Sequence, residues 1–545
     1  MTAAVLLVAI IAEDPTVMRN APRDDAAPQA TLWRGDWLEV RGEVAGFLKV
    51  YDHRHERPGY VRGSVARVHR LDEATAPELR AVLRFLRDTA GSESLGIGYA
   101  ALYLRAAPAG ADTSEVLAAI GTMAARLARR ASARQAGGGD RSLPGASATA
   151  AALEVAESYG VGFRSIESEP AVLAARTPVR TRLCYDGEAW VQVLAAPAAA
   201  PIERARAALF LAGRGCGEVI LTGAPGAARN GAAAALVVAA TPADRRAWND
   251  RRVQALAGVD PSVLPPYLGG RVRLRRAEAH AWRAYDEVRK LDGAGEAPVV
   301  PDAAARAEGE AVRELALVDR GVLAPEDQDG YDEVAVRVAA ARWAVETPPR
   351  DAGKRRFRVD VARRGAGETC VRVVDAGAAG GARPARAAAV TPRVVGERCT
   401  YGVVWPSAVR WSPSGDAATI AVQPLPAWTE LWVIRRAGAA SASRVGAGAP
   451  ANDNGAPVVA WSIEPLVPAA SEPDAGYVES AGFSPDGAHL LVVREARASG
   501  RAQRRFQVLS LTTLAVEKQA GDADRLLAFK RWSAAWWRSG TLALR

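Results

Sequence analysis

Short apolar runs separated by turn residues fill residues 13–72. Leu38 with Val40 and Tyr60 with Val61 belong to such runs, and glycine, proline and aspartate residues stand between them. Runs of this length, rich in β-branched and aromatic residues and bounded by turn residues, are typical of strands. We therefore predict a small β-barrel over this segment.

The hydrophobic period changes to that of a helix over residues 75–347. Thr75 and Glu78 form a capping box, and Pro77 stands in the first turn. The apolar residues that follow recur at helical spacing: Leu79, Val82, Leu83 and Leu86. Further segments of this kind predict an all-α middle domain, an irregular solenoid or bundle, because the 34-residue tetratricopeptide pattern is not kept.

A period of two returns over residues 354–545. A unit recurs there, in which an aromatic-ended strand, a Ser-Pro-x-Gly turn and two apolar strands follow one another. The turns lie at residues 412–415 and 484–487, and a degenerate third copy is expected at residues 529–540. These patterns predict a β-rich, blade-like C-terminal domain.

The first domain resembles the bacterial Src-homology-3-like domain in four segments. Residues 32–40 (LWRGDWLEV) are similar to its hairpin, and residues 17–22, 46–50 and 59–64 to its opening, central and closing strands. The resemblance implies a small barrel with a ligand groove. This chain departs from the family in its central strand, where Phe-Leu replaces the usual Trp-Tyr or Trp-Leu, and in a charged insert at residues 52–57.

The Ser-Pro-x-Gly turns resemble those in the blades of the periplasmic propeller family typified by the translocation protein TolB. The resemblance implies a propeller fold, although about 190 residues make only three to four blades. An open β-meander or a partial propeller is therefore the alternative to a closed ring.

Three aromatic residues of the predicted barrel are candidates for a ligand groove: Trp33, Trp37 and Tyr60. Rigid aromatic side chains supply contact area at little cost in conformational entropy, which suits a peptide or a glycan-linked peptide. Packing in the core or at the rim of the barrel is the other interpretation of these residues.

Residues 1–12 form an apolar segment that ends in small residues, followed by Glu13. The segment has the h-region of a signal peptide but lacks a basic n-region. We predict a truncated signal peptide, and a first buried strand of the N-terminal domain is the alternative.

The four cysteines fall into two pairs that are close in sequence. Cys184 and Cys216 form one pair, and Cys370 and Cys399 form the other. Because no C-x-x-C arrangement is present, two structural disulfides are favoured over a metal site, and four unrelated thiols are the alternative. Disulfides indicate an oxidising compartment, so we predict a periplasmic or secreted protein.

Composition adds a basic C-terminal region. The chain of 545 residues has a net charge of +9, and residues 354–545 hold 26 Lys and Arg against 16 Asp and Glu, which alone gives +10. A basic surface can bind nucleic acid, but the interpretation favoured here is a solvated surface without a nucleic-acid partner. No apolar run reaches the roughly 20 residues of a membrane span.

The sequence contains no catalytic constellation. The five histidines have no metal-ligand spacing, which predicts no metal site and no cofactor. Ser480 lacks the preceding glycine of a nucleophile elbow. Cys184 and Cys216, the candidate nucleophiles of a papain-like peptidase, lie in a helix-rich stretch without a histidine partner.

These patterns together predict a non-enzymatic binding or scaffold protein of the cell envelope. Its Src-homology-3-like domain is expected to recognise peptidoglycan or a peptide, or to join the scaffold to an envelope protein. The alternative is a cell-wall hydrolase or peptidase of unrecognised type that this domain directs to the wall.

Overall fold

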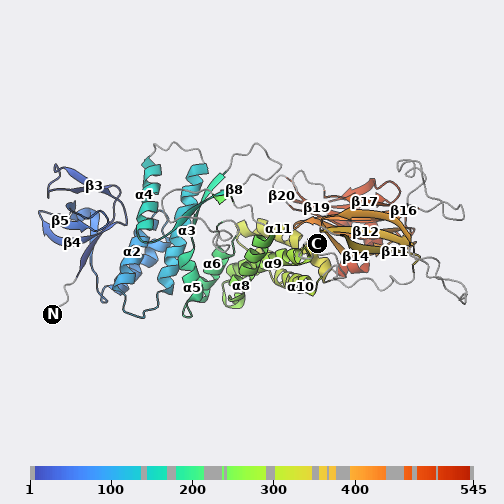
Figure 1. Ribbon diagram of the computed structural model, residues 1–545, viewed down its shortest axis with the longest axis horizontal. Helices are drawn as coiled ribbons and strands as arrows, with labels where there is room; N and C mark the ends of the chain where they lie inside the picture. Colours follow the sequence, from blue (N-terminus) through green and yellow to red (C-terminus); the bar gives the residue numbers. More distant parts are fainter. Residues whose placement is uncertain are drawn as a thin grey trace, which may run out of the picture. The chain divides into compact units, whose positions relative to one another are not determined.

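The computed structural model divides into two compact units, Met1–Leu264 and Pro265–Arg545 (Figure 1). It describes residues 6–136, 144–168, 180–213, 216, 236–237, 242–289, 301–345, 355–364, 367–375, 393–436, 460–468, 475–498 and 501–539. The predicted helical domain at residues 75–347 is shared between the units, because its last three helices belong to the second one.

A seven-stranded antiparallel sheet begins the first unit, with the order β3-β2-β6-β5-β4-β1-β7. Its strands are β1 (Leu7–Ile11), β2 (Thr16–Arg19), β3 (Pro28–Leu32), β4 (Trp37–Val44), β5 (Phe47–Asp52), β6 (Arg57–Arg62) and β7 (Ala66–Arg70). The predicted β-rich domain is present. In the described residues the edge strands β3 and β7 do not pair with each other, so the sheet is not a closed barrel.

The segment predicted to be a signal peptide contributes strand β1 to this sheet. β1 lies between β4 and β7, and four of its residues are fully buried: Val8, Ala9, Ile10 and Ile11. Alternate residues pack on opposite faces, against the helices and in the core of the sheet. A strand buried on both faces is a continuous apolar run, which has the same composition as an h-region. The predicted domain start at Glu13 is therefore corrected, since the sheet includes residues 7–11.

Helices follow the sheet along the chain (Figure 1), and all but the last of those in this unit share a hydrophobic core with strand β1. They are α1 (Ala76–Asp88), α2 (Glu93–Ala106), α3 (Ser114–Ala136), α4 (Pro144–Ser158), α5 (Glu188–Ala195), α6 (Pro201–Leu211) and α8 (Pro242–Ala257). A three-stranded sheet, β10-β8-β9, interrupts them, with β8 at Phe163–Ser168, β9 at Arg180–Tyr185 and β10 at Leu236–Val237. The prediction of an all-α middle is therefore corrected, because this segment also contains strands.

The second unit begins with three helices that pack on its sheets. They are α9 (Pro266–Arg289), α10 (Asp302–Ala316) and α11 (Pro325–Ala341), followed by a short 3-10 helix, Arg342–Ala344. Trp343 packs with Val403 and Trp405 of the sheet, and Ala339 packs with Tyr477. These shared cores explain why the three helices belong to the second unit.

Two sheets make up the β-rich part of the second unit. The smaller sheet has the order β11-β12-β13, with β11 (Phe357–Arg364), β12 (Glu368–Asp375) and β13 (Arg393–Thr400). The larger sheet holds two four-stranded antiparallel meanders. The first is β14 (Val403–Trp411), β15 (Ala417–Leu425), β16 (Trp428–Arg436) and β17 (Trp461–Leu466), and the second is β18 (Gly476–Phe483), β19 (His489–Ala498), β20 (Arg501–Ser510) and β21 (Val516–Ala520).

The two meanders reproduce the recurring unit of the sequence. In the first turn, Ser412 N–H donates to the Ala417 carbonyl over 2.8 Å, and Ser412 Oγ accepts from Ala417 N–H over 3.1 Å. In the second turn, Ser484 and His489 repeat both bonds at 3.0 and 2.9 Å. The glycine of each turn has a positive φ, 75° and 71°. Parallel pairing of β16 with β18 joins the meanders.

The predicted third copy is wrong. Its segment forms two short helices, α13 (Leu527–Trp532) and α14 (Ala535–Ser539). Phe529 and Trp537 are buried there against β19 and β20. Aromatic residues that the sequence pattern assigned to a strand thus cover a sheet face from short helices. Within the described residues, the meanders do not close into a propeller.

Candidate functional site

All four cysteines are bonded in the predicted pairs, Cys184 with Cys216 and Cys370 with Cys399. The second bond joins directly opposed residues of β12 and β13. A papain-like mechanism needs a free thiolate, and in this state neither of its two candidate cysteines has one. Among the helices in the described parts of the chain, none has the length and apolar character needed to cross a bilayer.

A cleft of about 480 Å³ opens in the first unit between the N-terminal sheet and the helices that follow. Trp37 and the turn residues Asp52, His53 and Arg54 line it from the sheet. Arg105 of α2 is among the side chains that line it from the helices. The cleft is within the size range of small-ligand sites, and it is built from segments far apart in the sequence.

Two carboxylates lie in this cleft. The side chain of Asp36 accepts a hydrogen bond from Trp33 N–H over 2.8 Å and lies 4.0 Å from Arg54. Burial raises the pKa of Asp36, and the nearby Asp52 raises it further, although the hydrogen bond and Arg54 oppose the shift. Asp52 is buried and accepts from the Arg54 and His55 backbone N–H groups. The carboxyl groups of Asp36 and Asp52 are therefore held in place at the wall of the cleft.

Arg105 is the exposed cation of the cleft. Its guanidinium lies 4.8 Å from the centre of the Trp37 ring. Arg54 is engaged by Glu154 over 2.8 Å, whereas Arg105 has no carboxylate within ion-pair distance among the described residues. A guanidinium held over an aromatic face is positioned to bind a carboxylate through two parallel hydrogen bonds. The cleft is thus lined by both a cation and carboxylates.

The structure places one of the three predicted aromatic residues in the cleft. Trp37 lines it, whereas Trp33 contributes a backbone N–H to Asp36 and Tyr60 lies on β6 beside Arg19 and Lys49. This cleft therefore contains one of the three predicted aromatic residues, Trp37.

The residues that sequence reasoning missed are Asp36, Arg105 and Tyr159, all of which line the cleft. Tyr159 donates a hydrogen bond to the Gly35 carbonyl over 2.5 Å, which ties the end of α4 to the hairpin. No local pattern marks these residues, because sheet and helices meet only in the folded chain.

The histidines of the charged insert bind carboxylates. His53 Nε2 lies 2.6 Å from Glu39 Oε2, and His55 Nδ1 lies 2.6 Å from Asp52 Oδ2. In the described residues the one group with metal-ligand proximity is Glu368 with Cys370 and Cys399, whose sulfurs are bonded to each other. That group therefore lacks the thiolates that a metal would need.

Comparisons with protein-family models, with curated proteins and with solved structures find no significant match for this chain. The geometry of the chain itself therefore carries the functional argument.

Proposed function

We propose that this protein is a non-enzymatic envelope binding protein whose N-terminal cleft takes a short peptide or a peptide-bearing wall fragment. The observation that carries the proposal is that one cleft is lined by Arg105, which lies over Trp37, and by two carboxylates, the half-buried Asp36 and the buried Asp52. Peptides bear carboxylates, amines and apolar side chains, so such a ligand matches each of these groups. The resemblance of residues 13–72 to the Src-homology-3-like domain supports the same ligand class.

The two disulfides support a secreted or periplasmic location, where stem peptides of peptidoglycan are the abundant ligands of this chemistry. Each stem peptide offers carboxylates to Arg105 and apolar side chains to Trp37. The helices and the second unit then serve as the scaffold of the bound protein.

Co-sedimentation with isolated sacculi tests this proposal. We expect the full chain to sediment with sacculi at low and at moderate salt, and Arg105→Gln to reduce the bound fraction several-fold, because the variant removes a charge-assisted contact worth about 1.5–3 kcal/mol. Arg129→Gln is the matched control, since Arg129 is an exposed arginine of α3 outside the cleft. The proposal is contradicted if Arg105→Gln binds as well as Arg129→Gln. It is also contradicted if binding of the wild-type chain vanishes at moderate salt.

The same sample tests the hydrolase alternative. Soluble wall fragments released from the sacculi during incubation, or a cleared band in a zymogram, favour the hydrolase. Intact sacculi that retain the protein favour the binding protein.

A further inference from the structure

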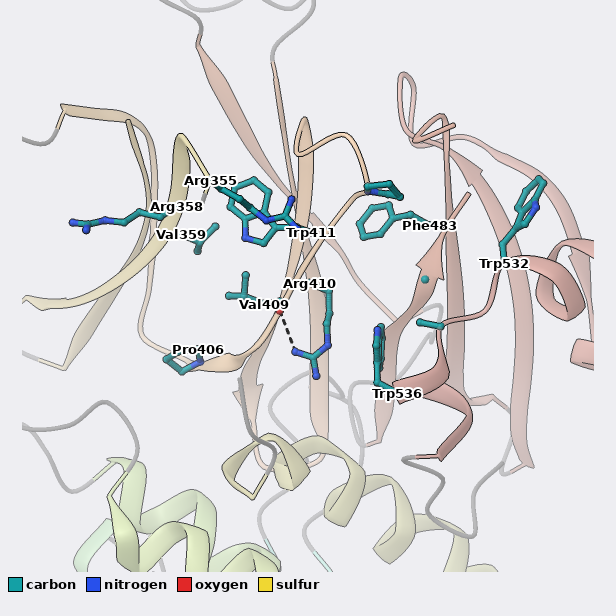
Figure 2. Close-up of a pocket in the computed structure, with 13 residues that line it drawn as sticks. Arg355, Arg358, Val359, Pro406, Val409, Arg410, Trp411, Phe483, Trp532 and Trp536 are labelled. Atoms are coloured by element: carbon teal, nitrogen blue, oxygen red, sulfur yellow. Dashed lines mark hydrogen bonds between the residues drawn. The ribbon is translucent and has the colours of Figure 1, made fainter. Parts of the chain in front are cut away.

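A second cavity lies within the second unit, where β14 and β18, the first strands of the two meanders, meet the C-terminal helices (Figure 2). Its volume is about 390 Å³, which is within the range of small-ligand pockets. Four aromatic side chains and three arginines line it, and no acidic residue is among the lining residues: Trp411, Phe483, Trp532, Trp536, Arg355, Arg358 and Arg410. The lining is thus apolar and positively charged.

Both of these strands, β14 and β18, are irregular at this cavity. The pairing of β14 with β15 shifts between Trp405 and Arg410, and the pairing of β18 with β19 shifts between Ser480 and Gly482. The first irregularity exposes Pro406 and Val409 to the cavity. Bulges redirect side chains and are frequent beside functional sites. An irregularity thus occurs in the first strand of each meander, and residues of both strands line the cavity.

The segment after α13 closes one side of the cavity. Ala534 N–H donates to the Ala481 carbonyl over 2.8 Å, in the bulge of β18. Gly482 has a φ of +137°, and a Cβ there would lie 2.8 Å from the Trp532 carbonyl oxygen. The close approach holds Trp532 and Trp536 at the cavity. This wall is therefore preformed.

Two of the three arginines at the cavity are engaged by the protein. Arg358 pairs with Asp360 over 3.0 Å. Arg410 is buried, donates to the Ser407 and Val409 carbonyls, and lies over the Trp343 and Trp536 rings.

Arg355 is different. It lies 5.6 Å from the centre of the Trp411 ring and makes one long hydrogen bond, 3.5 Å, to the Ser412 carbonyl. Within the described residues no carboxylate is in ion-pair range of its guanidinium. Figure 2 shows Arg355 beside Trp411, with Phe483 and Trp536 across the cavity from them. Arg355 is thus a cation at the end of an aromatic-lined space, with no anionic partner in the part of the chain that the structure describes.

We propose that this cavity binds a small aromatic anion, whose flat ring packs among Trp411, Phe483 and Trp536 and whose carboxylate or phosphate ester binds Arg355. Aromatic side chains favour flat rings through offset and edge-to-face packing. A planar guanidinium binds a carboxylate or a phosphate through two parallel hydrogen bonds. The three arginines and the lack of an acidic lining residue disfavour a cationic ligand.

Calorimetric titration of the oxidised full-length protein tests the proposal with three naphthalene probes. 1-Naphthoate and 1-naphthamide have nearly the same shape and differ in charge, and 1-naphthyl phosphate separates the two anion types. We expect naphthoate or naphthyl phosphate to bind roughly tenfold or more tightly than naphthamide, since a charge-assisted contact is worth about 1.5–3 kcal/mol. The tighter of the two anions identifies the headgroup.

Arg355→Gln links this binding to the cavity. We expect the variant to lose the preference for the anion over naphthamide, while Arg525→Gln, an exposed arginine of the same unit outside the cavity, keeps it. Circular dichroism and thermal midpoints confirm that both variants are folded. Absence of anion binding, equal affinity for naphthamide, or an unchanged preference in folded Arg355→Gln overturns the proposal. The comparison of naphthoate with naphthamide needs no variant and decides the question if Arg355→Gln fails to fold.

Discussion

Glu308 makes the stability of the second unit depend on pH. Its side chain is fully buried in α10, and neither carboxylate oxygen has a hydrogen-bond partner among the described residues. Burial raises the pKa of Glu308 well above its ordinary value of 4.5, and the charge of Arg342 opposes this shift only in part. A raised carboxyl pKa means that the folded state keeps a proton which the unfolded state releases above about pH 4.5.

The free energy of unfolding therefore falls as pH rises from 4.5 to the folded-state pKa. The slope is about 1.4 kcal/mol for each pH unit in that window. Glu308→Gln stays neutral at every pH, so it removes this slope. As pH rises, we expect the variant to become more stable than the wild type. Each kcal/mol of difference in unfolding free energy should raise the thermal midpoint of the variant over that of the wild type by about 2–4 °C.

Urea unfolding followed by tryptophan fluorescence between pH 5 and pH 8 measures the effect. Glu310→Gln is the control, because Glu310 lies on the same helix, is about half exposed and pairs with Arg313. We expect the control to follow the wild type at every pH. Parallel pH profiles for Glu308→Gln and the wild type would refute a neutral buried carboxyl at this position.

Three further results are expected. Glu479→Ala should lower the free energy of unfolding by about 3–5 kcal/mol in chemical denaturation, because it removes the buried partner, 2.8 Å away, of Arg342; a loss below 1 kcal/mol contradicts a buried ion pair. Ser412→Ala and Ser484→Ala should each lower the free energy of unfolding by about 1–3 kcal/mol, since each removes the acceptor of a turn N–H that is buried in the first turn and partly buried in the second, and a loss below about 0.5 kcal/mol in either variant contradicts the role of that serine. Alkylation of the unfolded, unreduced protein should label no cysteine by mass spectrometry, and any labelled thiol contradicts one of the two disulfides.

Local turn chemistry made the recurring unit predictable from the sequence. A serine, a proline and a glycine at fixed spacing specify the same hydrogen bonds wherever they occur, so the turns beginning at Ser412 and Ser484 were found without any tertiary information. The parallel pairing of β16 with β18 has no such signal. It depends on two strands separated by a long stretch of sequence, and it decides how the meanders join.

The apolar run at residues 7–11 shows where composition alone misleads. A strand buried on both faces and an h-region share the same residues, and only the pairing with β4 and β7 separates them. The cleft was likewise only partly predictable from the sequence. Trp37 was found because aromatic residues stand out in a barrel, but Arg105 lies on a helix whose packing against the sheet the sequence pattern did not reveal.

Strand β1 also has a consequence for how the chain is made. It is synthesised before β4 and β7, the two strands that cover its edges, and β7 ends only at Arg70. Until that residue has left the ribosome, Val8 to Ile11 remain an exposed apolar segment on the nascent chain. During that interval a targeting factor or a chaperone that binds apolar segments competes with the sheet for the same residues. Because of the order of synthesis, other proteins can bind this short strand on the nascent chain, whereas in the folded protein it is paired on both edges and buried.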